Sequence, residues 1–433
     1  MTFTRRRVLG AATGAVTGAA TAGLVGSVAA CRPERAPTPP LDPDRWDSVR
    51  AQFALDPDVA HLSTYVFAPH PAPVRAAIDR HRDGLDRDGT GYLHDNAERL
   101  AGAVAAAAAR YLRGRPEQVA FTDSTTMGLG LLYGGLRLGP GDEVLTTEHD
   151  FYATHESLRL RSSRDEVTVR RVRLYADPSA AGADEIVANL AGAVTARTRA
   201  IALTWVHSST GVKLPIRPIV DAVRRRNPQT LVCVDAVHGF GAEESTPDRL
   251  GCDFLVTGCH KWLLGPRGTG LVWGAEPAWS QVMPTIPTFD GSRIGAWLGF
   301  DTPAVAPGAA NTPGGYHSFE HRWALADAFA FHTAVGPGRI AARTRELAAA
   351  LKDGLAGIPG VRLVTPRSAD VSAGLVCCEV EGTRPDVAVS RLKAAGVVAT
   401  STPYRPSYLR FGPTIANSEQ DVEAAVRAVR ALR

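Results

Sequence analysis

Residues 230–270 read TLVCVDAVHGFGAEESTPDRLGCDFLVTGCHKWLLGPRGTG, and this stretch decides the fold. Two short apolar runs rich in β-branched residues, at 231–234 and 254–256, are typical of buried parallel strands. Asp235 ends the first run, and Lys261 lies shortly after the second. Parallel strands end at the same edge of an open α/β sheet, where such sheets bind their ligands. We therefore expect Asp235 and Lys261 to lie close together in a binding site.

A lysine that follows a buried strand has two interpretations. Most such lysines are surface residues whose charged ends reach water. The alternative is that Lys261 is partly desolvated, so that its pKa is lowered and its amine forms a Schiff base. A Schiff base with pyridoxal phosphate (PLP) also needs a carboxylate that keeps the pyridine nitrogen protonated, so that the ring acts as an electron sink. Asp235 supplies a carboxylate at the same sheet edge, which favours the second interpretation.

The two halves of this stretch resemble a known family. D-A-V-H, ending on His238, and C-H-K-W-L-L-G-P-R-G-T-G, which begins at Cys259, are similar to the cofactor region of class V aminotransferases of PLP fold type I. The isopenicillin N epimerase-like branch is the most similar. The resemblance implies an α/β fold with a mostly parallel seven-stranded sheet in a large domain and a small α/β C-terminal domain. It also implies that Lys261 holds PLP, that His238 contacts the cofactor ring, and that His260 supports the phosphate end.

Composition narrows the functional classes. A chain of 433 residues is long enough for two domains, and its 45% hydrophobic and 21% charged content is that of a globular protein. A net charge of +4 is too small to favour nucleic-acid binding. The six cysteines fit the spacing of neither a zinc site nor a disulfide scaffold, so no metal is expected.

The phosphate site is expected at the turn between a strand at 119–122 and a helix that begins near Met127. Serine and threonine at such a turn are first of all N-cap residues, but the turn also presents free N–H groups to a phosphate. The resemblance implies that Thr125 and Thr126 bind the PLP phosphate. Ser124 replaces the glycine that is usual in the family.

Two further loops are expected to contact the cofactor ring. After a strand at 143–147 the family places an aromatic ring on the cofactor, and the sequence leaves His149 and Phe151 as alternatives. Ordinary core packing is the competing explanation of Phe151. After a strand near 200–206, Ser208 lies where many relatives have an asparagine that contacts the phenolic oxygen of PLP.

Arg410 lies inside the apolar segment Tyr408–Phe411, where a buried arginine is costly unless it pairs with an anion. The resemblance makes Arg410 the anchor of the substrate carboxylate, which its planar guanidinium binds bidentately.

A cysteine desulfurase needs a mobile cysteine shortly before this strand, and residues 399–408 contain none. The sequence therefore disfavours a desulfurase.

These residues predict a PLP-dependent enzyme that acts at the α-carbon or amino group of an amino acid or a derivative, by transamination or epimerisation. The alternatives are a PLP-dependent β-lyase of the C–S lyase type and a lipid-anchored homologue without catalysis.

The N-terminus indicates export. T-R-R-R-V-L at residues 4–9 resembles a twin-arginine motif, and an uncharged Ala/Gly-rich run leads to V-A-A-C, which resembles a lipobox ending on Cys31. A membrane-spanning helix is the competing interpretation, but alanine and glycine add little apolar area. We expect a signal peptide over residues 1–31 and a protein of the cell envelope, attached to the membrane only through a lipid on Cys31.

The rest of the chain is expected to form a linker over residues 32–50, a PLP-binding large domain over 51–335 and a small domain over 336–433. Helical patterns occupy about 96–112, 215–226, 338–355 and 385–395, and a closing helix begins at Ser418. The weakly periodic, Pro/Gly-rich stretch from 274 to 318 is long for a loop. The resemblance implies that it crosses the interface of a homodimer towards the partner's active site.

Overall fold

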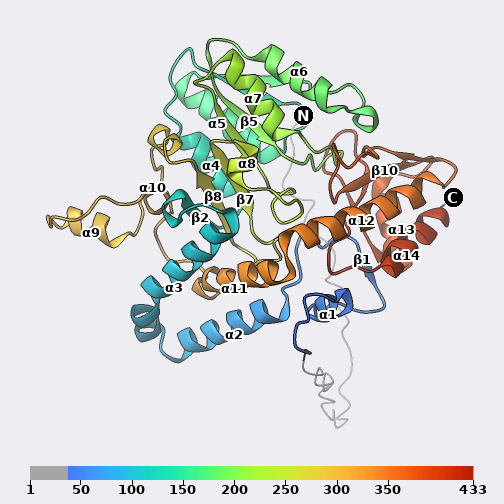
Figure 1. Ribbon diagram of the computed structural model, residues 1–433, viewed down its shortest axis with the longest axis horizontal. Helices are drawn as coiled ribbons and strands as arrows, with labels where there is room; N and C mark the ends of the chain where they lie inside the picture. Colours follow the sequence, from blue (N-terminus) through green and yellow to red (C-terminus); the bar gives the residue numbers. More distant parts are fainter. Residues whose placement is uncertain (1–37, 433) are drawn as a thin grey trace, which may run out of the picture. The chain divides into compact units, whose positions relative to one another are not determined.

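A seven-stranded sheet with the order β2-β8-β7-β6-β5-β3-β4 is the centre of the computed structural model (Figure 1). Its strands are β2 (Val119–Thr122), β3 (Glu143–Thr147), β4 (Thr168–Val172), β5 (Thr198–Thr204), β6 (Leu231–Asp235), β7 (Phe254–Gly258) and β8 (Gly270–Gly274). Neighbouring strands from β4 to β7 are parallel, whereas β8 runs antiparallel to both β7 and β2. The expected α/β fold with a mostly parallel seven-stranded sheet is confirmed.

The structure describes residues 38–432. The signal peptide expected over 1–31, with its Cys31, and the first part of the 32–50 linker lie outside the described residues. Within that linker range, α1 (Trp46–Ala51) is a helix whose Val49 is fully buried in an apolar cluster with Phe53 and Phe331. The folded part therefore begins before residue 51. None of the helices in residues 38–432 is both long and apolar enough to cross a membrane.

The buried strands of the sheet divide their side chains between two cores, because successive residues of a strand point to opposite faces. Ile201 and Leu203 of β5 enter one core, and Ala200 and Ala202 enter the other. The first core includes helices α2 (Ala72–Arg87), α3 (Gly89–Leu112), α6 (Ala183–Ala193), α7 (Ile216–Arg226), α8 (Pro247–Leu250) and α11 (Phe319–Val335), and the second includes α4 (Thr125–Gly135) and α5 (Tyr152–Asp165). Burial on both faces explains the continuous apolar runs in the sequence.

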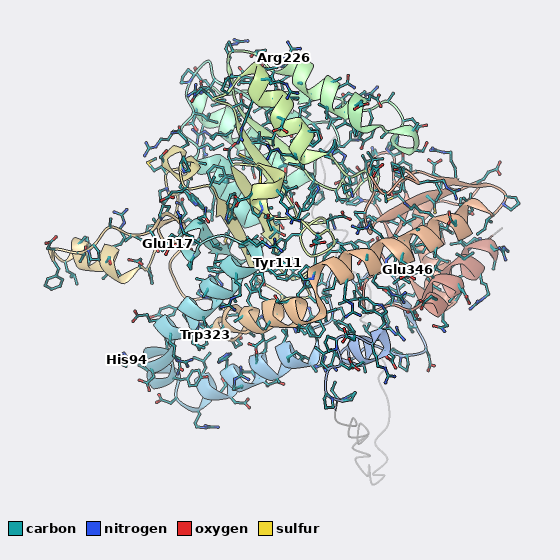
Figure 2. The ribbon with its side chains drawn as sticks, in the orientation of Figure 1. His94, Tyr111, Glu117, Arg226, Trp323 and Glu346 are labelled. Carbon is teal, nitrogen blue, oxygen red and sulfur yellow. The ribbon has the colours of Figure 1, made fainter. Side chains whose placement is uncertain are left out.

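Helices α2, α3 and α11 pack together beside the sheet, as Figures 1 and 2 show. Trp323 of α11 meets His81 of α2 edge to face, with ring centroids 5.4 Å apart. The Tyr111 hydroxyl of α3 lies 2.9 Å from Nδ1 of His332 in α11. These aromatic and polar contacts fix the three helices relative to one another.

The C-terminal part has an antiparallel sheet of its own, with the order β12-β13-β10-β9. Its elements are α12 (Pro337–Ala356), β9 (Val361–Leu363), β10 (Val376–Val380), α13 (Pro385–Ala394), β11 (Val397–Val398), β12 (Thr400–Ser401), β13 (Leu409–Phe411) and α14 (Glu419–Arg430). They surround a separate hydrophobic core, as expected of a small α/β domain. Strand β1 (Ala60–His61) pairs with β11, so the N-terminal segment completes this part. Residues 38–432 belong to one compact unit, and the boundary at residue 336 stays a prediction.

Residues 283–316, which we call the arm, carry two short helices, α9 (Gly291–Trp297) and α10 (Pro307–Ala310). Helix α9 projects from the remainder of the described chain (Figure 1). The large apolar side chains exposed on the arm are Met283, Ile286, Phe289, Ile294, Trp297, Leu298, Phe300 and Tyr316. An apolar surface of this extent marks an interaction site.

Candidate functional site

Asp235 and Lys261 lie where the sequence predicts, at the carboxyl ends of two adjacent parallel strands. Asp235 is the last residue of β6 and is 2% exposed, and its carboxylate accepts a 3.0 Å hydrogen bond from the Val237 amide. Burial raises the pKa of Asp235, and the positive charge of Lys261 opposes this shift. Desolvation lowers the pKa of Lys261, and the Asp235 carboxylate opposes that shift in turn. The two groups therefore share one site.

His238 lies between Lys261 and Trp262. The indole Nε1–H of Trp262 donates to Nδ1 of His238 over 3.1 Å, so a neutral His238 carries its proton on Nε2. Burial holds the pKa of His238 well below its usual range, and the positive charges of Lys261 and Arg410 add to the shift. Lys261 Nζ lies 3.4 Å from His238 Nε2. In this tautomer His238 donates towards a neutral Lys261 amine, which is the form that acts as nucleophile or base.

Thr125 is placed to bind an anion at the start of α4. The neighbouring Ser124 is the N-cap, and its hydroxyl accepts a 3.1 Å hydrogen bond from the Met127 amide. Thr125 Oγ1 is buried and has no hydrogen-bond partner among the described residues. Thr126 is exposed at the same turn. A buried unpaired hydroxyl beside the N-terminus of an eleven-residue helix fits a phosphate oxygen.

Gly258, the last residue of β7, keeps space open next to Thr125. A Cβ atom at this position would lie 3.0 Å from Thr125 Oγ1 and 2.9 Å from Cε1 of His260. His260 is half-buried, and burial lowers its pKa. Its Nδ1 lies 3.5 Å from the Thr269 carbonyl oxygen. Together these groups form a cradle whose size and polar lining fit the phosphate end of PLP, and the phosphate roles of Thr125 and His260 stay predictions.

The two candidates for the ring beside the cofactor differ in their surroundings. His149 stacks on Tyr175, with centroids 4.2 Å apart and an interplanar angle of 10°. Its Nε2 is buried and has no partner among residues 38–432, and burial lowers its pKa. Phe151 instead meets the Tyr404 ring edge to face at 6.1 Å. The unpaired nitrogen favours His149 as the cofactor-facing ring.

A buried polar cluster behind His149 has no counterpart in the sequence predictions. The Tyr175 hydroxyl lies 2.9 Å from Nδ1 of His207 and 3.1 Å from Oγ1 of Thr210. His207 is fully buried, and burial holds its pKa well below the usual range. The neutral His207 and Thr210 thus hold Tyr175, the ring on which His149 stacks, in place.

Arg410 enters the site from β13 and is 8% exposed. Its Nη1 donates to the Ser208 carbonyl over 2.8 Å, its Nε donates to Thr400 Oγ1 over 3.2 Å, and its guanidinium lies over the Tyr65 ring at 5.2 Å. No Asp or Glu carboxylate within residues 38–432 forms an ion pair with it at 4.0 Å or less. Nη2 makes no hydrogen bond to the described residues. A buried guanidinium in this state fits an incoming carboxylate.

Tyr65 links Arg410 to the lysine side of the site. Its fully buried ring stacks on Trp262 at 5.8 Å, with an interplanar angle of 19°. Its hydroxyl lies 2.6 Å from Thr400 Oγ1. The contacts thus run without interruption from Arg410 through Tyr65 and Trp262 to His238. Sequence reasoning gave Tyr65 and Trp262 no role, although Trp262 directly follows Lys261.

Ser208 is buried, and its hydroxyl lies 2.7 Å from the Tyr404 hydroxyl. Its carbonyl accepts the hydrogen bond from Arg410. Ser208 therefore joins Arg410 to Tyr404. Tyr404 was not predicted, because nothing in the pattern of residues 399–408 separates it from an ordinary loop tyrosine.

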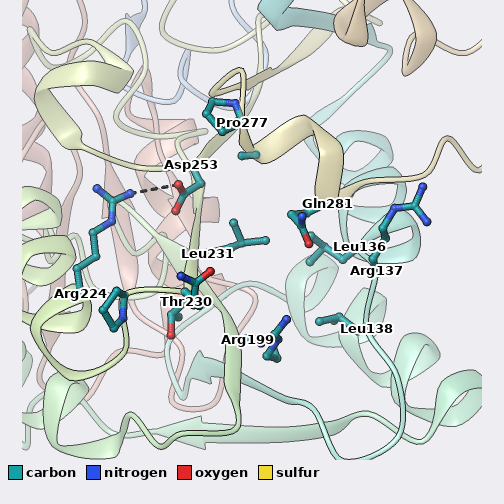
Figure 3. A pocket seen from close by; sticks show the side chains of 13 residues that line it. Leu136, Arg137, Leu138, Arg199, Arg224, Thr230, Leu231, Asp253, Pro277 and Gln281 are labelled. Carbon is teal, nitrogen blue, oxygen red and sulfur yellow. Dashed lines mark hydrogen bonds and ion pairs between the residues drawn. The ribbon is translucent and has the colours of Figure 1, made fainter.

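A different pocket, of about 490 Å³, lies at the amino ends of the strands (Figure 3). Arg137, Arg199 and Arg224 line it, and Arg224 pairs with Asp253 over 3.1 Å. It contains none of the predicted site residues. Within residues 38–432, no group of three or more His, Cys, Asp or Glu side chains is arranged to hold a metal ion.

Comparisons with known proteins identify the family of the chain. Residues 81–424 match the family described as Aminotransferase class-V. Isopenicillin N epimerase of Streptomyces clavuligerus is 28% identical over 404 residues, which cover 89% of this chain and 98% of that protein. A probable cysteine desulfurase of Xylella fastidiosa is 27% identical over 425 residues, or 91% of this chain and 97% of that protein. The structure of a C-DES mutant with glycine covalently linked to the PLP cofactor has a TM-score of 0.80, 20% identity and coverage of 88% and 98%.

Proposed function

This chain belongs to the aminotransferase class-V family of PLP-dependent enzymes, and we propose that it inverts the configuration of an amino acid or amino-acid derivative at the α-carbon. The similarity to an epimerase over nearly that protein's whole length supports this reaction branch. Transamination begins with the same removal of the α-proton, and it is the alternative outcome of the test below. A PLP-dependent β-lyase shares that first step as well.

The residues present fit PLP. Lys261 would hold the cofactor, Asp235 would face its ring nitrogen, and Thr125, Gly258 and His260 would receive its phosphate. His149 would lie on its ring, and Ser208, with Tyr404 and Arg410, would border its phenolic side. When bound, PLP would withdraw the electron pair left at the α-carbon after the proton is removed.

The remaining steps belong to the protein. The guanidinium N–H groups of Arg410 that have no partner among the described residues bind the substrate carboxylate. This contact fixes the position of the α-carbon. The Lys261 amine, whose pKa desolvation lowers to about 8, removes the α-proton in its neutral form. The Nε2–H of His238 orients that amine at 3.4 Å. The observation that carries the proposal is this pairing of a desolvated lysine, whose pKa is lowered, with a buried arginine that lacks an Asp or Glu partner among the described residues.

The test is α-hydrogen exchange in heavy water with both enantiomers of a panel of amino acids. NMR measures the exchange, and chiral chromatography detects the inverted product. Inversion without an oxo-acid supports the proposal. Oxo-acid formation with conversion of PLP to its amine form would indicate transamination, and sulfide from cysteine would indicate a lyase or desulfurase. Lack of exchange with every amino acid, despite bound PLP, would overturn enzymatic action on amino acids.

The cofactor assignment is tested separately by borohydride reduction of the purified protein. The label should be fixed on Lys261 and should be absent from Lys261→Ala. Lys352→Met is the matched control, because Lys352 is also buried but donates to the carbonyls of Pro366 and Arg367 in the C-terminal part. It should retain the reducible cofactor. A reducible adduct on Lys261→Ala would refute the assignment.

We also propose that the protein is a homodimer in which the arm contacts the second copy. Trp297 is 82% exposed and Phe300 is 66% exposed. A pocket of about 620 Å³ beside the arm is lined by apolar groups that include Phe289 and Tyr316. Sedimentation should show a dimer that Trp297→Glu weakens, whereas Val387→Glu, a change at an exposed apolar residue of α13, should leave it intact. A monomeric wild-type protein would refute the dimer.

Export by the twin-arginine route and lipidation at Cys31 complete the proposal. Replacement of Arg5 and Arg6 by lysine should trap the protein inside the cell. Cys31→Ala should be exported but should not take up a radiolabelled fatty acid. Export of the double-lysine variant would contradict the route, and an unlabelled wild-type protein would contradict the anchor.

A further inference from the structure

Tyr404 occupies the tip of the loop between β12 and β13, six residues before Arg410. The loop is closed by Thr402, whose amide donates to the Tyr408 carbonyl over 2.9 Å and whose hydroxyl accepts from the Tyr408 amide over 2.9 Å. The Ser407 hydroxyl donates to the Thr402 carbonyl over 2.6 Å. These bonds hold the loop in one shape, so the position of Tyr404 is built into the fold.

The Tyr404 hydroxyl and the Arg410 guanidinium both contact Ser208. Tyr404 Oη lies 2.7 Å from the Ser208 hydroxyl, and Arg410 Nη1 lies 2.8 Å from the Ser208 carbonyl oxygen. A carboxylate bound by Arg410 has its α-carbon one bond away. The phenol of Tyr404 therefore borders the part of the site where Arg410 would bind a carboxylate.

Different residues connect Arg410 to Lys261 and to Tyr404. On one side the guanidinium lies over Tyr65, which stacks on Trp262 and through it reaches His238 and Lys261. On the other side it bonds to Ser208, which leads to Tyr404 and the Phe151 ring. The two proton-carrying side chains thus approach the carboxylate anchor through different sets of contacts.

The other phenol near Arg410 is not available for this role. The Tyr65 hydroxyl bonds to Thr400, which also accepts from Arg410 Nε, and its ring is covered by the guanidinium. Tyr404 is half-buried, and burial raises its pKa, so the phenol keeps its proton at neutral pH. The phenol therefore holds a proton to donate, and the nearby Arg410 charge, which opposes the effect of burial on the pKa, stabilises the phenolate that forms.

Building on the proposed inversion reaction, we propose that Tyr404 is the second catalytic acid–base group and delivers a proton to the α-carbon on the side away from Lys261. The C–H bond breaks when the neutral Lys261 amine takes the α-proton and becomes an ammonium. The electron pair at the α-carbon then forms a new C–H bond with the Tyr404 proton, which leaves a phenolate. Proton exchange with water restores both groups, so no co-reactant is consumed.

The experiment compares wild type, Tyr404→Phe and Tyr408→Phe, with both enantiomers of the amino acid that wild type exchanges fastest in heavy water. Tyr408→Phe is the matched control, since Tyr408 belongs to the same loop but packs against Val364 and Cys377. Bound PLP, measured from its visible absorbance, and thermal stability should be equal in all three proteins. General acid–base catalysis is worth about 10²–10⁴-fold, and Tyr404→Phe should lose inversion by that factor.

The same variant should keep exchange of the α-hydrogen of the enantiomer that Lys261 deprotonates, and Tyr408→Phe should keep both reactions. In wild type, newly inverted product should carry solvent deuterium from the first turnover. Inversion by Tyr404→Phe at the wild-type rate, or substrate-derived hydrogen in the product, would overturn the role of Tyr404 alone. Wild-type exchange without inversion would overturn the proposed function together with this role.

Discussion

Lys261 Nζ lies 3.4 Å from His238 Nε2, and the indole of Trp262 donates to the other nitrogen of the same imidazole over 3.1 Å. The tryptophan that follows the lysine in sequence therefore determines which histidine nitrogen carries the proton. It does so because an indole N–H only donates, which leaves Nδ1 as acceptor and Nε2 as donor. The orientation of the lysine amine thus depends on a residue that does not itself touch the amine.

Trp262→Phe should reduce turnover and change its pH dependence. Loss of one hydrogen bond is worth about 1 kcal/mol, or roughly a five- to tenfold lower kcat. Without the indole, Nδ1 of His238 can bind a proton, so the pKa of His238 should rise. As the pH is lowered, the variant should therefore lose activity at a higher pH than the wild type does. Trp279→Phe is the control, because Trp279 is equally buried but donates to the Gln118 carbonyl, away from the site. An unchanged pH profile would refute this role of Trp262.

Gly258→Ala should weaken PLP binding, because the added Cβ would fall 3.0 Å from Thr125 Oγ1 and 2.9 Å from a carbon of His260. Equilibrium dialysis of the PLP-free protein should show an affinity at least tenfold lower, or about 1.4 kcal/mol. Gly102→Ala, in α3 with no atom near the added Cβ, should leave affinity unchanged and add roughly 0.5–1 kcal/mol of stability. Wild-type affinity in Gly258→Ala would place the phosphate elsewhere.

Arg410→Leu should bind PLP normally but turn over poorly. The lost charge-assisted, bidentate contact should cost roughly 3 kcal/mol, on the order of a hundredfold in kcat/KM. The loss should be smaller for an amide analogue of the same substrate, which has no carboxylate to pair. Equal kcat/KM values for wild type and variant would remove Arg410 from the substrate site.

Glu419→Gln should remove a pH-dependent part of the stability. Glu419 begins α14, and its hydrogen bond with Arg343 lowers its pKa from 4.5 to about 2. A lowered folded-state pKa stabilises the protein above the unfolded value, and this stabilisation is lost as pH falls from about 4.5 to 2. Because Glu419 is largely exposed, we expect about 0.5–1 kcal/mol.

Urea unfolding at pH 7 and pH 3 measures this effect. The wild type should lose more stability between the two pH values than Glu419→Gln does. Glu423→Gln, on the same helix with a surface ion pair to Arg427, serves as control and should resemble wild type. Parallel behaviour of all three proteins would contradict the assignment.

The sequence by itself determined the strands that build the site. The apolar runs at 231–234 and 254–256 are buried on both faces, which is stable only when they form inner strands of the sheet. The polar residues that follow them must therefore lie at the edge of the sheet. The sequence predicted the ends of the helices less accurately than it predicted these strands. The alanine-rich pattern predicts a helix from about residue 96, but α3 begins at Gly89, because the Asp88 side chain caps the Gly91 amide at 3.0 Å and so overcomes the poor helix propensity of glycine.

Only the tertiary structure decided which other side chains complete the site. Tyr65 and Tyr404 are about 340 residues apart, yet both lie within one contact of Arg410 or its partner Ser208. The segment after β1, the loop before β13 and the loop after β5 meet only in the tertiary structure. Such a meeting leaves no periodic pattern in the sequence. Local pattern fixes the face on which a residue lies, whereas long-range packing fixes its neighbours. For this reason the sequence predicted Asp235, Lys261 and Arg410 as site residues, and it did not predict the indole and phenol groups that the structure places around them.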